Sequence, residues 1–379
     1  MTKHERDMRC NPGAGSIPCA AMQGRFDPGA AAAPDSGIFG LTVGPEQAAV
    51  HVLGVPFDAT ASYRKGAWRG PEAVVRASRQ IDLHDLVTGD PWEAGIFMLP
   101  PDAEIAAWNA EASRLADGVI AAGGDVARDK RLKGDLARVN TLGAQVNARV
   151  RDQVEAILAA GRLPAVVGGD HSVAFGAIEA AAAHFAKPDE GIAVLHFDAH
   201  ADLRRAYEGF EWSHASILEN VLRKIEGVSQ IVQVGIRDLS EDELQRIRGS
   251  EGRVSTLFDH EWASARLDGR DLRALIRKHL ANLPKHVFVT FDVDGLDPTL
   301  CPNTGTPVPG GLSWHEAMLW LEELARSGSM VVGLDVNEVN PGAAGPNEDS
   351  WDAIVGARLL YRLIGFALAT RGNHPARSA

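Results

Sequence analysis

The sequence predicts an α/β protein in which helices cover both faces of one mostly parallel β-sheet. Short apolar runs alternate with helical stretches along most of the chain. Residues 163–186 read as a strand, a tight glycine turn and an Ala-rich helix, which is the unit that joins parallel strands. At 379 residues and 45% hydrophobic content, the chain can bury one sizeable core, so we expect a single domain with terminal tails.

The chain begins with a segment of unusual composition. Residues 1–36 are rich in Gly, Ala and Pro and lack a periodic apolar pattern, which predicts a flexible or meandering arm. We expect the folded domain to span residues 37–368 and a short tail to cover residues 369–379.

Within the domain, the first elements can be assigned in order. Residues 48–53 form an apolar run that predicts a buried strand. A Gly-rich loop follows over residues 58–71, and Pro71 favours the start of a helix that runs to Ser78. From Asp102 the chain turns helical, and the last helix of this region ends at Gly161. The apolar positions of that last helix face are Leu142, Val146, Val150, Val154, Ile157 and Leu158.

Strands and helices alternate through the rest of the domain. Further strands are expected at residues 163–167, 191–197, 230–234, 253–257, 286–291 and 330–334. The helical stretches between them include residues 217–225, 272–280 and 314–325. Ser313 and Glu316 have the spacing of a capping box at the start of the last of these helices.

The composition argues against several classes of protein. A net charge of −12 argues against binding to nucleic acid or an anionic membrane surface and suits a small cationic substrate. Cys10, Cys19 and Cys301 lack a CxxC spacing, which fits free thiols in a reducing compartment. The chain lacks an uninterrupted apolar stretch of about eighteen residues and an N-terminal apolar signal region, so we expect a cytoplasmic protein.

The most informative stretch is residues 196–202, His-Phe-Asp-Ala-His-Ala-Asp, at the end of an apolar run. Asp198, His200 and Asp202 alternate with apolar residues, and an extended segment would place all three on one face. Carboxylates this close repel each other unless a cation neutralises them. Oxygen and nitrogen donors without a thiolate suit Mn, Ni, Fe or Zn better than Ca or an iron–sulfur cluster.

Polar residues also follow three other predicted strands. They are His171, then Asp292 with Asp294, then Asp335 with Asn337 and Glu338. Ligand sites of α/β sheets lie beyond the carboxyl ends of the strands, so we expect these residues to gather at one edge. Two His and four Asp carry four formal negative charges, which two divalent ions would cancel. These six candidate metal ligands are His171, Asp198, His200, Asp202, Asp292 and Asp294.

Such a centre indicates a hydrolase. Two divalent ions activate water for nucleophilic attack and stabilise the negative charge that develops. The sequence lacks an exposed Gly-x-Ser-x-Gly elbow and a Walker loop, which removes the commonest serine-nucleophile and nucleotide-binding interpretations.

Three motifs resemble those of the ureohydrolases, the family that contains arginase, agmatinase and guanidinobutyrase. They are Gly168-Gly169-Asp170-His171-Ser172, Asp198-Ala199-His200-Ala201-Asp202 and Phe291-Asp292-Val293-Asp294-Gly295-Leu296-Asp297-Pro298. The resemblance covers about residues 37–367, is closest to the guanidine-cleaving, agmatinase-like members, and implies a three-layer α/β/α fold with a binuclear metal centre. Mn is the default metal and Ni the alternative. A homo-oligomer, a trimer or hexamer, is also implied.

The resemblance assigns the ligands to two ions. One ion would be held by His171, Asp198, Asp202 and Asp292. The other would be held by His200, Asp198, Asp292 and Asp294, so that Asp198 and Asp292 bridge.

Catalytic roles follow from the same resemblance. Glu338, in Glu-Val-Asn-Pro, matches the family's guanidinium-binding glutamate and would orient the substrate carbon. Asp202 would pass a proton to the departing nitrogen. His214 lies near the place of the family's proton-shuttling histidine, but its setting is Ser-His-Ala-Ser in place of the usual His-Gly.

The loop at residues 203–213 bears on the substrate. Arginase-like enzymes carry short polar residues there that hold an α-carboxylate and an α-amino group. In their place this chain has Tyr207, Glu208, Phe210, Glu211 and Trp212. We expect Tyr207 and Trp212 to narrow the pocket and favour an apolar or cationic group. As substrates, we therefore expect guanidine, alkylguanidines and biguanides such as metformin to rank first, agmatine next, guanidinobutyrate third and arginine last.

Other interpretations stay open. The aromatic residues of the loop could instead pack it against a neighbouring subunit. Agmatinase or guanidinobutyrase activity is the first alternative function. A single-zinc deacylase also uses an Asp-x-His pair, but His171, Asp202 and Asp294 favour two ions. A non-catalytic subunit of a mixed oligomer is the remaining alternative, although all the family's ligand residues are present here.

Overall fold

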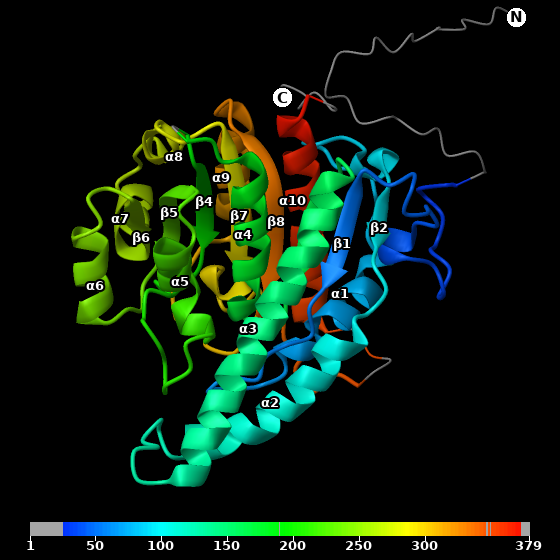
Figure 1. Cartoon of the computed structure of the whole chain (residues 1–379). Helices are drawn as coiled ribbons and strands as arrows, with labels where there is room; N and C mark the ends of the chain where they lie inside the picture. Colours follow the sequence, from blue (N-terminus) through cyan, green and yellow to red (C-terminus); the bar gives the residue numbers. More distant parts are fainter. Residues whose placement is uncertain (1–25, 189, 346–347, 349, 373–379) are drawn as a thin grey trace, which may run out of the picture.

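Eight parallel strands form one sheet in the part of the chain that the structure describes (Figure 1). The computed structural model describes residues 26–188, 190–345, 348 and 350–372. The strand order is β2-β1-β3-β8-β7-β4-β5-β6. The strands are β1 Val50–Gly54, β2 Ile96–Met98, β3 Leu163–Val167, β4 Ile192–Phe197, β5 Val228–Ile236, β6 Val254–Phe258, β7 His286–Asp292 and β8 Met330–Asn337. Every pairing in this sheet is parallel, which confirms the predicted class.

Helices cover both faces of the sheet, which confirms the three-layer α/β/α fold (Figure 1). They are α1 Gly70–Ser78, α2 Ala103–Ala121, α3 Lys130–Ala159, α4 Ala174–Phe185, α5 Ile217–Lys224, α6 Glu241–Arg248, α7 Asp259–Leu267, α8 Leu272–Leu280, α9 Trp314–Arg326 and α10 Trp351–Thr370. Helices α1 and α7 to α10 cover one face, and α2 to α5 cover the other. Successive residues of β4 show why both faces are apolar. Val194 packs with α3, α4 and α5, whereas Phe197 packs against Trp320 of α9.

Most predicted strands shift by one or two residues at their ends, and three elements differ in more informative ways. Strand β2 is not among the predicted strands, because three residues are too short to give a recognisable pattern. Strand β8 runs three residues beyond the predicted end, since its polar residues Asp335 and Asn337 are buried and hydrogen-bonded to one another. Helix α10 ends at Thr370, two residues past the predicted domain boundary. Within the described residues, α10 is the one helix long and apolar enough to cross a membrane, but 72% of that stretch is buried inside the molecule.

The last part of the predicted arm lies against the domain. The ring of Phe26 contacts Trp92, with 5.2 Å between ring centroids. The carbonyl oxygen of Ser36 accepts hydrogen bonds from the guanidinium of Arg79, the residue that follows α1. Most of the arm, residues 1–25, lies outside the described residues.

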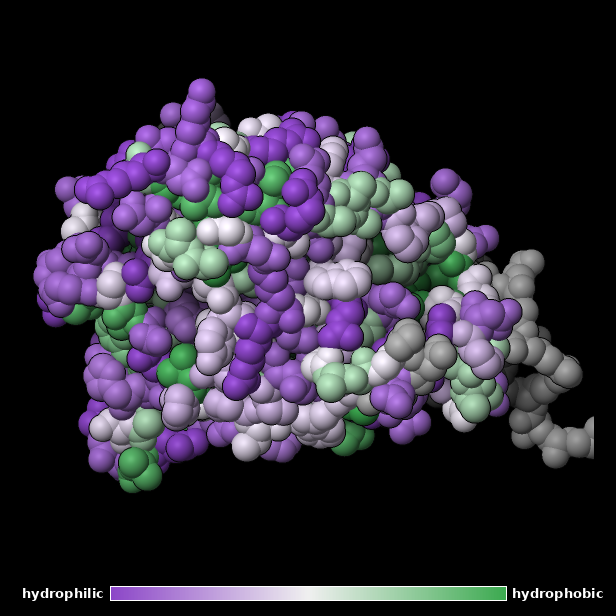
Figure 2. Space-filling model, turned by 90° about the horizontal axis from the view of Figure 1, so that it is seen from below, coloured by the Kyte–Doolittle hydropathy of each residue, from purple (hydrophilic) through white to green (hydrophobic). Residues whose placement is uncertain are grey.

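The strand order brings the predicted site together. Strands β3, β8, β7 and β4 are neighbours at the centre of the sheet, and their carboxyl ends lie at its lower edge in Figure 1. Each of the polar clusters predicted from the sequence follows one of these four strands. Figure 2 looks onto this end of the molecule, where the surface is mainly hydrophilic and the hydrophobic patches are small and separate.

Candidate metal centre

The loop after β3 places His171 through a close backbone contact. A Cβ atom at Gly169 would lie 2.0 Å from the carbonyl oxygen of Phe57, so only glycine fits there. The carboxylate of Asp170 then caps the short helix η4, His171–Val173, by accepting a hydrogen bond from the Ser172 amide. These contacts hold His171 beside the ends of β4 and β7.

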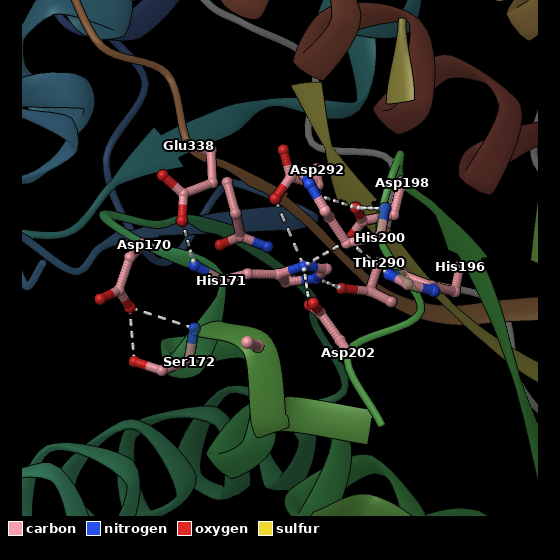
Figure 3. Close-up of polar contacts among 12 residues, drawn as sticks. Asp170, His171, Ser172, His196, Asp198, His200, Asp202, Thr290, Asp292 and Glu338 are labelled. Atoms are coloured by element: carbon pink, nitrogen blue, oxygen red, sulfur yellow. Dashed lines mark hydrogen bonds and ion pairs between the residues drawn. The ribbon is translucent and has the colours of Figure 1, made fainter. Parts of the chain in front are cut away.

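The imidazole of His171 lies among three carboxylates (Figure 3). Its Nδ1 is 3.0 Å from Oδ2 of Asp198, 3.2 Å from Oδ2 of Asp202 and 3.5 Å from Oδ2 of Asp292. All four residues are buried. The structure therefore brings together the four residues that the sequence assigns to one ion.

A second group forms around His200. Its Nδ1 is 3.1 Å from Oδ2 of Asp294 and 3.4 Å from Oδ1 of Asp198. Asp198 thus faces His171 with Oδ2 and His200 with Oδ1, as expected of a shared ligand. The amide of Asp294 donates to Oδ1 of Asp292 at 2.8 Å, which ties the two groups together.

The backbone of the second motif is not extended throughout, contrary to the prediction for residues 198–202. Asp202 has a φ of 54°, in the left-handed region. The chain turns there, and this turn directs the carboxylate towards His171. Glu338 also has a positive φ, of 62°. Strained residues of this kind gather at functional sites.

The charges of the cluster fit a pair of divalent cations. Burial and the neighbouring Asp294 and Asp198 raise the pKa of Asp292 well above its ordinary value. Burial and Asp198 raise the pKa of Asp202 to about 7. Burial opposes a charged His200, but Asp294 and Asp198 raise its pKa to about 12. Without metal, the site balances its charge with protons. Divalent ions can replace these protons, and oxygen and imidazole donors suit first-row transition metals.

Sequence reasoning missed the residues that surround the ligands. Nε2 of His196 lies 2.8 Å from Oδ2 of Asp198. His196 lies two residues before Asp198 and so shares its face of β4, which is a signal that the sequence does contain. Nε2 of His171 lies 2.8 Å from the hydroxyl of Thr290, which donates to Asp335. Thr290 carries no such signal, because threonine is common in strands.

Glu338 lies directly beside the centre. It follows β8, and its Oε1 accepts a hydrogen bond of 3.0 Å from the amide of His171. The side chain is buried, and burial together with Asp170 and Asp294 raises its pKa well above the ordinary value. Gly305 lies beside Oε2, which a Cβ atom at that position would meet at 3.5 Å, an ordinary van der Waals distance.

His214 and Tyr207 lie near each other. His214 begins the short helix η5, His214–Ser216, and its Nδ1 is buried with no hydrogen-bond partner among the described residues. Burial, together with the positive charge of His200, lowers the pKa of His214 to about 4, so its imidazole is neutral near pH 7. The ring of Tyr207 lies 6.3 Å from that of His214, centroid to centroid.

The other aromatic residues of this loop are packing residues. Phe210 is fully buried between α2 and α3, against Val119 and Val139. The ring of Trp212 lies edge-on to Phe175 of α4, with centroids 5.0 Å apart, and Lys224 lies over it at 4.1 Å. These contacts explain the position of Trp212 without any contact to a substrate. The predicted role of Trp212 in substrate binding therefore stays a prediction, and these contacts do not support it.

Comparison with known proteins identifies the family. Residues 48–365 match the arginase family. The chain belongs to the arginase family. It is 33% identical to an N(1)-aminopropylagmatine ureohydrolase of Thermus thermophilus over 321 residues, which cover 84% of this chain and 90% of that protein. It is 30% identical to an agmatinase of Sodalis glossinidius over 327 residues, covering 85% and 88%.

A solved structure supports the fold. The agmatine ureohydrolase of Thermoplasma volcanium superimposes with a TM-score of 0.63 at 24% identity, covering 86% of this chain and 92% of that one. The predicted family is therefore confirmed. As an arginase-family ureohydrolase, the chain is a hydrolase of C–N bonds, and its His/Asp cluster suits the binuclear divalent-metal centre of the family.

Proposed function

We propose that this chain hydrolyses the guanidino group of a linear, decarboxylated guanidino amine of the agmatine type. Water is consumed, the bond between the guanidino carbon and the alkylated nitrogen breaks, and urea and an amine are released. The observation that carries this proposal is the buried carboxylate of Glu338, which is joined through the His171 amide to the metal-ligand cluster. A buried carboxylate of this kind pairs well with a guanidinium.

The relatives and the loop contacts favour agmatine-type substrates over metformin. The ranking that placed small guanidines and biguanides first depended on an aromatic wall around the pocket. Phe210 and Trp212 are engaged in packing against α2, α3 and α4, which leaves Tyr207 as the one aromatic candidate of that group. Relatives named for N(1)-aminopropylagmatine and agmatine support the linear amines as substrates.

In the proposed mechanism, each residue has a task set by its position. Glu338 accepts hydrogen bonds from the guanidinium and orients its carbon. Two divalent ions, Mn or alternatively Ni, would be held by the six His and Asp ligands and would activate water and stabilise developing negative charge. Asp202, whose pKa is raised to about 7 by burial and Asp198, passes a proton to the departing nitrogen. Neutral His214, with its free Nδ1, exchanges protons with solvent.

The proposal also includes a homo-oligomer in the cytoplasm. The net charge of −12 supports a protein that avoids nucleic acid and anionic membranes. Two ligand groups that share Asp198 support a binuclear hydrolase over a single-zinc deacylase. Retention of all six ligands supports a catalytic subunit over a non-catalytic partner in a mixed oligomer. Light scattering of the purified protein would determine the subunit number.

A substrate panel tests the function. Protein reconstituted separately with Mn and with Ni is assayed for urea release from agmatine, N(1)-aminopropylagmatine, guanidinobutyrate and arginine, and for guanidine or metformin cleavage. We expect kcat/KM for agmatine or N(1)-aminopropylagmatine to exceed that for arginine and metformin by at least about tenfold, or about 1.4 kcal/mol. A higher value for arginine or metformin would overturn the substrate assignment. The absence of urea release from every compound would overturn the catalytic assignment.

A further inference from the structure

His196 is a buried histidine whose role the ligand assignment leaves open. It is fully buried on β4, and its Nε2 lies 2.8 Å from Oδ2 of Asp198. The same carboxylate oxygen lies 3.0 Å from Nδ1 of His171. With His171, Asp198 and Asp202, His196 forms a group whose donor atoms are close enough to hold one ion. His196 is therefore either a third nitrogen ligand or a hydrogen-bond donor to Asp198.

The neighbouring strand decides between these roles. Nε2 of Gln233, on β5, donates a hydrogen bond of 2.8 Å to the carbonyl oxygen of Ala201, which can only accept. This fixes the amide nitrogen of Gln233 on the side that also faces Nδ1 of His196, at 3.2 Å. The amide oxygen of Gln233 accepts from the hydroxyl of Thr256, at 2.9 Å, which supports the same orientation.

The tautomer of His196 follows from this chain of hydrogen bonds. An amide nitrogen is a donor, so Nδ1 of His196 must accept and carry no proton. In a neutral imidazole the proton then resides on Nε2, the atom that faces Asp198. A protonated Nε2 cannot coordinate a metal ion.

We propose that His196 is a positioning residue that donates its Nε2–H to the shared ligand Asp198, held in that tautomer by Gln233 and Thr256. This inference rests on the proposed metal centre. The hydrogen bond fixes the rotation of the Asp198 carboxylate, so that one oxygen faces His171 and the other faces His200. It also keeps the centre rich in oxygen, with one imidazole for each ion, a donor set that manganese accepts well.

Metal binding, measured without substrate, tests the inference. Dissociation constants for Mn are determined by chelator competition for the wild type and three variants, and electron paramagnetic resonance reports whether two coupled ions are present. His196→Phe removes the donor and should weaken Mn binding by about 10- to 100-fold. His196→Gln keeps an N–H near the position of Nε2 and should restore affinity to within about threefold of the wild type. His286→Phe replaces a buried histidine at the opposite end of β7, beside Phe185, and should leave affinity unchanged.

The outcomes separate the two roles. Unchanged Mn affinity in His196→Phe, or an equal loss in His196→Gln and His196→Phe, would overturn the donor role. X-ray absorption of the Mn-loaded wild type should show one imidazole per ion, and two imidazoles on one ion would overturn it as well. Thr256→Val is the alternative variant if His196→Phe does not fold. It removes the hydrogen bond from Thr256 to the amide oxygen of Gln233, without changing His196 itself. We expect it to lower Mn affinity several-fold. An unchanged affinity in that variant would count against the proposal.

The test is independent of the proposed substrate. A failed substrate panel would leave these binding results intact, because no guanidino compound enters the measurement. Conversely, if the enzyme is active but its Mn affinity does not change when His196 is replaced, this inference is refuted and the proposed function is not affected.

Discussion

Glu338 would bind the proposed guanidino substrate, and its hydrogen bond to the candidate metal site runs through the backbone. Its Oε1 accepts from the amide of His171, and Gly305 lies beside Oε2. Glu338→Gln keeps an oxygen for the His171 amide but loses the charge that would pair with a guanidinium. Because hydrogen bonds to charged groups contribute about 1.5–3 kcal/mol, we expect KM to rise by about 10- to 100-fold.

Metal affinity is the control for this variant. Steady-state kinetics with agmatine should show the change in KM, while chelator competition should give an Mn affinity within about threefold of the wild type. If the variant instead lost its metal at unchanged KM, Glu338 would belong to the ligand set and not to substrate recognition.

His214 is the residue proposed to exchange protons with solvent. Its pKa is lowered to about 4 by burial and by the nearby His200, so it is unprotonated across the neutral range and becomes protonated only as the pH falls towards 4. We expect His214→Asn to lower kcat by about 10²- to 10⁴-fold with little change in KM. Any fall in activity between pH 8 and 6 in the wild type should persist in the variant, since His214 does not titrate there. Stopped assays of urea across this range provide the measurement, and an unchanged kcat would contradict the role.

The residues at strand ends were predictable, and those of the aromatic loop were not. His171, Asp198 and Asp292 each lie at or just beyond the carboxyl end of an apolar run, so parallel pairing alone brings them to one edge. The sequence of the loop does not say which side of it faces the protein. Trp212 turns towards α3 and α4, whose packing against the loop is a tertiary contact with no local signal.

At the scale of elements, α2 and α3 support the loop that precedes His214. Asn140 of α3 donates to the carbonyl oxygen of Gly209 at 3.1 Å and accepts from the amide of Glu211 at 2.9 Å. Asn140→Ala removes both bonds, each worth about 1 kcal/mol. We expect amide exchange at Glu211 to accelerate by about fivefold or more. Because Tyr207 lies in the same loop, kcat/KM should also fall several-fold.

Thr141→Ala is the matched control for Asn140→Ala. Thr141 is the next residue of α3, and its hydroxyl donates within the helix to the carbonyl oxygen of Ala137. Hydrogen exchange with mass spectrometry should therefore show an unchanged loop. Equal loop exchange in Asn140→Ala and the wild type would show that the helix pair does not hold the loop.

The turn between β3 and η4 depends on glycine. A Cβ at Gly169 would meet the backbone of Phe57 at 2.0 Å, and backbone cannot rotate away as a side chain can. Gly169→Ala should therefore displace His171 and weaken Mn binding by at least about tenfold, the effect of disturbing a ligand's support. Gly134→Ala in α3 is the opposite case, because open space surrounds that position. It should stabilise the protein by up to about 1 kcal/mol.

Mn titration and urea unfolding of both glycine variants would check these expectations. Full Mn affinity in Gly169→Ala would mean that the turn shifts without moving His171.

The elements themselves were predictable where their patterns were strong. β4 and β7 are continuous apolar runs buried on both faces, and Ser313 caps α9 as its spacing with Glu316 predicts. The predicted bounds were wrong where polar residues are buried inside a strand. β8 continues through Asp335 and Asn337, whose buried side chains are hydrogen-bonded to each other and, for Asp335, to Thr290, which local sequence does not reveal.

At the scale of the whole molecule, the strand order brings residues that are distant in the sequence into one cluster of charged side chains. Residues 171, 198, 292 and 338 meet because β3, β8, β7 and β4 are adjacent in the sheet, and of these sheet neighbours only β7 and β8 are also consecutive along the chain. The sequence predicts a parallel sheet and one ligand edge, but the order of the strands comes from the structure. The fold thus places mutually repelling carboxylates at its centre, and metal ions would stabilise the whole sheet.

Metal binding should therefore depend steeply on pH and should stabilise the fold. In the metal-free centre, burial and the neighbouring Asp198 raise the pKa of Asp202 to about 7. The pKa of Asp292 is raised well above its ordinary value by burial and Asp294. His200 holds its proton to about pH 12 because Asp294 and Asp198 outweigh its burial. Metal must displace these protons, so affinity rises with pH, by about tenfold per pH unit for each proton released.

Chelator competition with Mn at pH 6.5, 7.5 and 8.5 should accordingly show at least about a hundredfold gain in affinity over the range. At pH 8, Mn at 100 times its dissociation constant should stabilise the fold by about 2.7 kcal/mol for each site, and removal by a chelator should lower Tm by several degrees. Asp294→Asn removes one ligand charge from the second group and should reduce both the stabilisation and the number of ions bound. An Mn affinity that stays constant from pH 6.5 to 8.5 would mean that the carboxylates are ionised before metal arrives, which would require another cation to neutralise them.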